Sequence, residues 1–70
     1  MRVTINKVNE ALRRLPGAED AEIVKGNGYW YFAGHEAAGF YSQSVYTMHL
    51  SDLTIEQWVD EYKAKREYRR

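Results

Sequence analysis

The chain has 70 residues, of which 44% are hydrophobic and 29% charged, with a formal net charge of zero and no cysteine. This length allows one domain over residues 1–70, and the composition is typical of globular rather than disordered or membrane proteins. The lack of cysteine excludes disulfides, thiolate zinc sites and cysteine nucleophiles, and it fits a reducing compartment. Without a membrane-length apolar run or the apolar core of a signal peptide, the sequence predicts a cytoplasmic protein.

A first helix is predicted over residues 5–15. Its apolar residues recur every three or four positions and line one face, as in an amphipathic helix; they are Ile5, Val8, Leu12 and Leu15. Thr4 is placed to cap the first turn, with Val3 and Val8 in the positions of a hydrophobic staple. Pro16 and Gly17 then end the helix.

Two strands are predicted at residues 21–25 and 29–33, on either side of Gly26-Asn27-Gly28. Asn-Gly is a strong signal for a tight hairpin because both residues tolerate positive φ. After a loop at 34–39 with one helical turn through 36–38, apolar and mixed positions alternate over residues 44–50. This alternation predicts a third strand.

A second helix begins after Thr54, which forms a capping box with Gln57, while Leu53 and Trp58 satisfy the accompanying staple. Its core stripe consists of Ile55, Trp58, Val59 and Tyr62. The sequence therefore predicts an α+β fold of the order helix, three-stranded antiparallel sheet, helix (αβββα), with a single layer of helices on a small sheet.

Residues that could support chemistry are few. His35 and His49, with Glu36 nearby, lack the three or four ligands of a zinc site and the orienting partner of a catalytic histidine. The serines lack the glycine-flanked elbow of a hydrolase nucleophile. We therefore expect no catalytic residue, no metal and no cofactor, and hence no enzyme.

Nucleic-acid binding is the alternative that the sequence leaves open. Aromatic residues on a sheet are typical of RNA-binding modules, but these also carry cations that neutralise phosphates. Between Lys25 and Lys63 there is no lysine or arginine. The basic run at 63–70 could contact a phosphate backbone, or it could simply be a solvated helix end.

The aromatic content points instead to a protein interface. Two tryptophans, six tyrosines and two phenylalanines are too many for so small a core, and Tyr and Trp are enriched at interfaces. The predicted interior rings are Trp30, Phe32, Tyr46 and Trp58. The predicted partner-binding patch consists of Tyr29, Tyr31, Phe40 and Tyr41. The alternative is that these four rings shield the sheet within the chain. A core of this size also favours association with a partner or with a second copy as a homodimer.

Three segments carry a resemblance to a known group of proteins. They are the run Gly26 to Phe32, the segment Tyr41 to Tyr46, and Leu50 to Trp58 with Leu-Thr-Ile-Glu-Gln-Trp. Together they resemble short uncharacterised proteins encoded by bacteriophages and other mobile elements of proteobacteria. The resemblance implies a setting and no activity, because small phage proteins commonly bind and block host proteins, including defence systems.

The hypothesis is a non-enzymatic protein-binding module, a phage-encoded inhibitor or modulator of a host protein, with the aromatic sheet face and the loop from Gly34 to Gln43 as its contact surface. The alternative is a nucleic-acid-associated protein that uses the basic C-terminal helix. A third hypothesis is a small-ligand site or enzyme between the subunits of a homodimer.

Overall fold

The computed structural model describes residues 2–40 and 42–67 and contains two α-helices and three strands. In chain order these are α1 (Ile5–Arg13), β1 (Glu22–Lys25), β2 (Trp30–Ala33), β3 (Ser44–Val45) and α2 (Ile55–Glu67). Single 3₁₀ turns lie at Ala37–Gly39, between β2 and β3, and at Leu50–Asp52, before α2. The predicted αβββα order and α+β class are confirmed.

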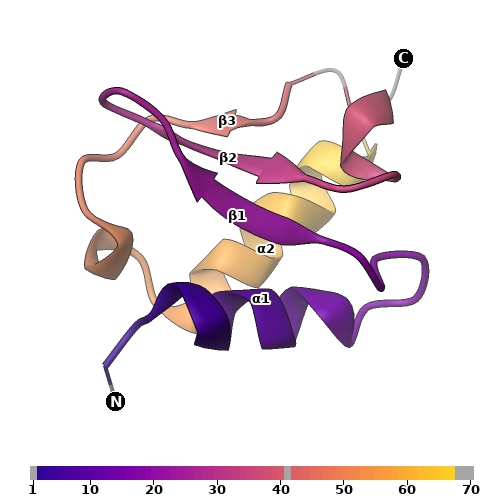
Figure 1. Cartoon of the computed structure of the whole chain (residues 1–70), viewed down its shortest axis with the longest axis horizontal. Coiled ribbons are helices and arrows are strands. Elements are labelled where there is room, and N and C mark those ends of the chain that lie inside the picture. Colours follow the sequence, from indigo (N-terminus) through magenta and orange to yellow (C-terminus); the bar gives the residue numbers. More distant parts are fainter. Residues whose placement is uncertain (1, 41, 68–70) are drawn as a thin grey trace.

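The three strands form one antiparallel sheet in the order β1-β2-β3. Figure 1 looks onto this sheet, with α2 crossing behind it and α1 lying beside β1. Ile23 pairs with Phe32, and Trp30 pairs with Val45. All four are buried, whereas Tyr31, between Trp30 and Phe32, is not. Since side chains alternate along a strand, one face of the sheet packs on α2 and the tyrosine-bearing face points away.

Helix α1 starts as predicted and ends early. The Thr4 hydroxyl accepts a hydrogen bond from the Lys7 amide at 3.2 Å, which confirms the cap. The helix ends at Arg13 rather than residue 15, because the amide of Leu15 turns back to the carbonyl of Leu12 in a tighter, three-residue bond.

A polar side chain attaches α1 to the sheet. Asn9 is buried in the middle of α1, and its Oδ1 accepts the Ile23 amide at 2.8 Å. One turn later Arg13 Nε donates to the Ala21 carbonyl at 3.0 Å. These two bonds use backbone groups at the free edge of β1, so α1 protects that edge from further strand pairing.

The hairpin lies where the sequence predicts it, within one residue at its boundaries. The Gly26 amide donates to the Tyr29 carbonyl at 2.8 Å, which leaves Asn27 and Gly28 at the tip. Gly28 has a φ of 81°, while Asn27 does not have a positive φ. The tip is therefore not the hairpin turn in which both central residues, here Asn27 and Gly28, have positive φ.

The predicted third strand over residues 44–50 is wrong beyond Val45. The Thr47 amide bonds back to the Val45 carbonyl at 3.1 Å, so the chain leaves the sheet. The Asp52 carboxylate then accepts hydrogen bonds from the Thr47 hydroxyl at 2.7 Å and the His49 amide at 3.1 Å. These bonds stabilise a turn at the place where the alternation favoured a strand.

Helix α2 supplies the centre of the core. Its capping box is confirmed, because the Gln57 amide donates to Thr54 Oγ1 at 3.1 Å and the Thr54 amide donates to Gln57 Oε1 at 2.9 Å. Trp58 is fully buried and meets Trp30 and Phe32 edge-on, with ring centroids 6.4 and 6.3 Å apart. Its Nε1 donates to the Leu50 carbonyl at 2.9 Å. The predicted interior positions of Trp30, Phe32 and Trp58 are thus confirmed.

Tyr46, the fourth predicted interior ring, is 82% exposed, so this prediction is wrong. It lies just beyond the end of β3, where the chain leaves the sheet. In the described part of the chain, no helix has the length and apolar character needed to cross a membrane.

Candidate protein-interaction surface

The sheet face that points away from α2 carries three tyrosines in contact, Tyr29, Tyr31 and Tyr46, which we call the tyrosine face. The ring centroid of Tyr29 lies 6.1 Å from that of Tyr31 and 6.0 Å from that of Tyr46. The planes are tilted by 39° and 47°. Tyr29 is thus the middle ring of the three, and no helix of the described chain passes in front of the strands in Figure 1.

Each ring is positioned by its strand or turn. Tyr31 is an outward residue of β2, opposite Val24 of β1 and Ser44 of β3. Tyr29 lies across Gly26, so closely that a Cβ at Gly26 would overlap the tyrosine ring. A side chain at position 26 would therefore displace the Tyr29 ring.

The tyrosine face combines apolar aromatic rings with polar phenol hydroxyls. The outward residues of the sheet are Glu22, Val24, Tyr29, Tyr31, Ala33, Ser44 and Tyr46, among which only Glu22 is charged. None of the three phenol hydroxyls has a hydrogen-bond partner among residues 2–40 and 42–67. Such rings offer large contact area together with a free donor and acceptor.

The structure places the predicted patch residues differently. Tyr29 and Tyr31 lie together on the tyrosine face. Phe40 does not, because it is 3% exposed and packs edge-on against Tyr62 with centroids 5.1 Å apart. The 3₁₀ turn causes this difference, since the Phe40 amide bonds to the Ala37 carbonyl. The prediction for Phe40 is therefore wrong, and Tyr41 lies outside the described residues.

Tyr46 is the residue of this surface that the sequence analysis missed. The alternation over residues 44–50 groups it with Met48 and Leu50 on an apolar strand face, but Met48 is 66% exposed and Leu50 begins a 3₁₀ turn. The register between β2 and β3 locates Tyr46 better than the hydrophobic alternation does. Ser44 faces outward beside Tyr31, so the second residue after it returns to the same face.

The backbone amides of both histidines donate to aspartate side chains. The His35 amide donates to Asp20 Oδ2 at 2.9 Å, and His49 lies in the turn stabilised by Asp52. Hydrogen bonds from the Thr47 hydroxyl and the His49 amide lower the pKa of Asp52. No group of three or more histidine, cysteine or acidic side chains that could hold a metal is found within the described residues.

A polar cluster of Glu36, Tyr62 and Arg66 connects three segments of the chain. Glu36 Oε1 accepts from the Tyr62 hydroxyl at 2.9 Å and from Arg66 Nε at 2.9 Å. Arg66 also donates to the Pro16 carbonyl at 3.0 Å. Burial, followed by the hydrogen bond to Glu36, raises the pKa of Tyr62 to about 12. The cluster attaches α2 to the loop after α1 and to the loop before Ala37, which is a structural role.

The basic C-terminal run is only partly described. Arg66 is used by the cluster with Glu36, and Lys63 is exposed on α2, while Arg69 and Arg70 lie outside the described residues. Nucleic-acid association through this run stays a prediction.

Comparisons of the chain with protein-family models, with curated proteins and with solved structures found no match. No residue of this chain therefore takes a role from another protein.

Proposed function

We propose that this chain is a non-enzymatic protein-binding module and that the tyrosine face is its contact surface. The observation that carries the proposal is the contact of three tyrosines on a sheet face that no helix of the described chain covers, with Tyr46 82% exposed. Burial of these rings in a partner's surface would remove apolar area from water and use the free hydroxyls. Tyrosine is among the residues that contribute most to binding when they are buried in an interface.

The arrangement of the rings supports binding at low entropic cost. Tyr29 is confined by Gly26 beneath it and by Tyr31 and Tyr46 on either side. A side chain that is ordered before binding loses less rotamer freedom in the complex. Tyr29 and Tyr31 then serve as the ordered part of the surface, and exposed Tyr46 as the part that extends toward the partner.

The chemistry of the face indicates the class of partner. With Glu22 as its one charged outward residue, the face suits an apolar protein surface that offers hydrogen-bond partners to phenols, and the resulting affinity should depend weakly on salt. The resemblance to phage-encoded proteins favours a host protein as that partner. Inhibition or modulation of a host factor, including a defence protein, is the role that we propose in that setting.

The test is capture from a proteobacterial lysate by the wild-type chain and by the double variant Tyr31→Ser, Tyr46→Ser. We expect the variant to keep its fold, measured by circular dichroism and urea unfolding. The amount of a specific partner that it captures should fall at least about tenfold. Capture by the wild type should persist at about 0.5 M NaCl.

The matched control is Lys63→Gln, Lys65→Gln, which changes two polar surface positions of α2 and leaves the tyrosine face intact. It should capture the partner as the wild type does. Equal capture by the tyrosine variant would contradict the proposal. Loss of a salt-sensitive nucleic-acid complex in the lysine variant alone would support the nucleic-acid alternative instead.

A further inference from the structure

The asparagines of the chain lie in two different surroundings. Asn6 and Asn9 belong to α1, whereas Asn27 lies at the tip of the hairpin between β1 and β2 and is followed by Gly28. The side-chain carbonyl of an asparagine can react with the backbone amide of the next residue when that amide is accessible and not engaged in a hydrogen bond. The surroundings of this amide therefore decide which asparagine reacts.

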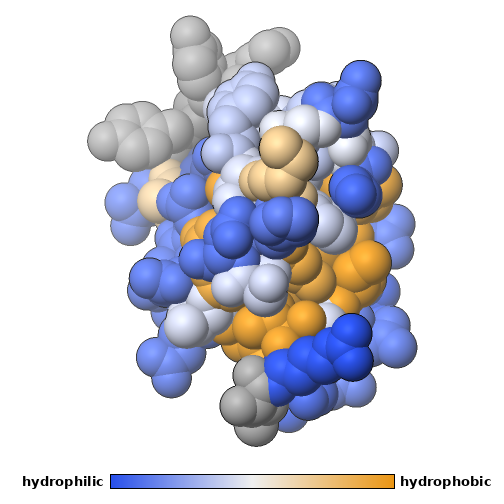
Figure 2. All heavy atoms as spheres, turned by 90° about the vertical axis from the view of Figure 1, so that its left-hand side faces the viewer, coloured by the Kyte–Doolittle hydropathy of each residue, from blue (hydrophilic) through white to orange (hydrophobic). Residues whose placement is uncertain are grey.

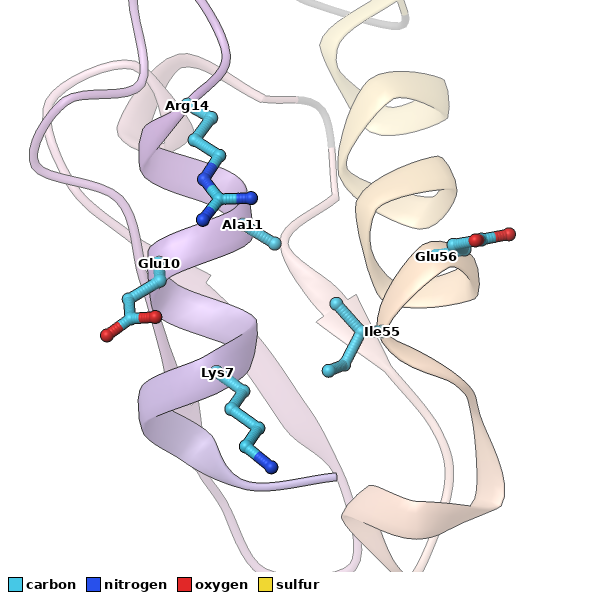
Figure 3. A pocket seen from close by; sticks show the side chains of 6 residues that line it. All are labelled: Lys7, Glu10, Ala11, Arg14, Ile55 and Glu56. Carbon is cyan, nitrogen blue, oxygen red and sulfur yellow. The ribbon is translucent and has the colours of Figure 1, made fainter. Parts of the chain in front are cut away.

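In α1 the amides that follow the asparagines are already engaged. Figure 3 shows Lys7 and Glu10, the residues after Asn6 and Asn9, on the ribbon of α1. The Lys7 amide donates to Thr4 Oγ1 at 3.2 Å. The Glu10 amide lies inside the helix, where amides bond to carbonyls four residues earlier. Asn9 is also buried, and its Oδ1 accepts a backbone amide of β1. Neither side chain can close on the next amide while α1 is formed.

At the hairpin tip both reacting groups are available. Asn27 and Gly28 are exposed, and no hydrogen bond within the described residues involves the Asn27 side chain or the Gly28 amide. A Cβ at Gly28 would meet no atom within 4 Å, so the space beside this residue is open. The tip lies at the upper left of Figure 1. Figure 2, which is seen from that side, shows mainly hydrophilic or neutral side chains at the height of the tip.

We propose that Asn27 is a site of spontaneous deamidation, which the chain undergoes without an enzyme. The Gly28 nitrogen attacks Cγ of Asn27, so that a bond between these atoms forms while the bond from Cγ to Nδ2 breaks. The proton of the Gly28 amide leaves with Nδ2 as ammonia, and a cyclic succinimide remains. Glycine favours this step because it has no side chain to hinder the approach. Nothing is oxidised or reduced.

Water then opens the succinimide at either of its carbonyl carbons. Opening at Cγ leaves aspartate with the original main chain. Opening at the backbone carbonyl carbon of residue 27 leaves isoaspartate, whose main chain runs through Cβ and Cγ and is therefore longer by one atom. In both products a carboxylate replaces the amide. The chain, which has ten acidic and ten basic residues, thus gains one negative charge.

Isoaspartate at position 27 weakens binding by the tyrosine face, and this part of the inference rests on the proposed function. The Gly26 amide donates to the Tyr29 carbonyl at 2.8 Å, and the Tyr29 ring lies across Gly26. Asn27 and Gly28 connect these two residues. A longer main chain between them changes how the hairpin closes, so the middle ring of the tyrosine face leaves its place. The aspartate product keeps the original main chain and hence this geometry.

The first measurement uses the full chain and needs no partner. The folded protein is incubated below its unfolding transition, and its peptides are analysed by mass spectrometry and by labelling with isoaspartyl methyltransferase. We expect conversion of Asn27 to aspartate and isoaspartate, while Asn6 and Asn9 stay intact in the same sample. The matched control is Asn27→Gln, whose longer side chain would have to close a larger ring. Since φ of Asn27 is not positive, glutamine fits there without backbone strain, and this variant should stay unmodified.

A parallel sample unfolded in guanidinium chloride shows whether the hairpin permits the reaction. We expect Asn27 to be converted in the folded and in the unfolded sample. An intact Asn27 in the folded chain, at a time when the unfolded chain is largely converted, would overturn the proposal. Conversion of Asn6 as fast as that of Asn27 in the folded chain would also contradict it, because the bonded amides of α1 would then give no protection.

The second measurement links the modification to partner capture. Chemical synthesis supplies the 70-residue chain with isoaspartate at position 27. We expect this chain to capture at least about tenfold less partner than the wild type. Asn27→Asp, which adds the charge without lengthening the main chain, should capture like the wild type. Treatment of the isoaspartate chain with isoaspartyl methyltransferase and S-adenosylmethionine, which converts isoaspartate to aspartate, should restore capture.

The outcomes separate this inference from the proposed function. Equal capture by the isoaspartate chain and the wild type, or an equal loss in Asn27→Asp, would contradict the effect of the longer main chain on the tyrosine face. If the wild type itself captures no partner, the proposed function fails. The mass measurement then still decides whether Asn27 is the deamidation site.

Discussion

Replacement of Trp58 by alanine should unfold the domain. Trp58 is fully buried, contacts Trp30 and Phe32 edge-on, and donates its Nε1 hydrogen to the Leu50 carbonyl. A tryptophan side chain buries up to about 250 Å², which at about 25 cal/mol per Å² corresponds to about 6 kcal/mol. The alanine retains a small part of this, so we expect a loss of about 3 to 5 kcal/mol. Domains of this size rarely have more than about 3 to 5 kcal/mol in total.

The assay is urea unfolding followed by far-ultraviolet circular dichroism. Trp58→Ala should show no cooperative transition, whereas Trp58→Phe should show one at reduced urea, because it keeps an aromatic ring and loses the hydrogen bond to Leu50. A cooperative transition of Trp58→Ala with a midpoint close to that of the wild type would refute the argument. Trp58 would then not be the centre of the core.

Three further predictions follow from local contacts. Thr54→Ala should lower the free energy of unfolding by about 0.5 to 2 kcal/mol, since Thr54 Oγ1 caps the Gln57 amide; an unchanged urea midpoint would exclude the cap. Because the pKa of Tyr62 is raised from 10.0 to about 12, the unfolded chain loses this proton first, and stability should fall as pH rises through that interval. Tyr62→Phe should reduce this decline in alkaline urea titrations; an equally steep decline would contradict the assignment. Gly26→Ala should displace the Tyr29 ring and weaken partner capture, whereas Gly39→Ala, which meets no atom within 4 Å, should not; equal capture by both would show that the position of Tyr29 does not matter.

Local signals predicted the elements that depend on local contacts. The caps at Thr4 and Thr54 need acceptors three residues from their donors, so a short stretch of sequence contains both partners. The hairpin at Gly26-Asn27-Gly28 is equally local. The core position of Trp58 follows from the apolar stripe of α2. At these places the hydrogen-bonding or packing partners lie a few residues apart, and the sequence pattern was sufficient.

The errors occur where hydrogen bonds between side chain and backbone compete with a hydrophobic pattern. Asp52 binds the Thr47 hydroxyl and the His49 amide, and this turn replaces most of the third strand. The predicted positions of Tyr46 and Phe40 are wrong for that reason and because of the turn at Ala37–Gly39. Asn9 shows a further limit, since its partner Ile23 lies 14 residues away and nothing in the local pattern joins them.

The sequence predicted that an exposed aromatic patch exists, but it identified only some of the residues that form it. The excess of aromatic side chains over what a small core can hold indicates an exposed patch, and Tyr29 and Tyr31 lie on it. Its third ring depends on the register between β2 and β3, because Tyr46 reaches Tyr29 only through the pairing of Ser44 with Tyr31. That register is a property of the folded sheet.

The most direct test of the tyrosine face is photo-crosslinking in the proteobacterial lysate. A photoreactive phenylalanine derivative at Tyr46, which is 82% exposed, should form an adduct with one discrete protein, the same protein that the wild type captures. The derivative at Glu19, an exposed loop position, should not form this adduct. No adduct from Tyr46, or the same adduct from both positions, would contradict the claim that the tyrosine face is where this chain binds its partner.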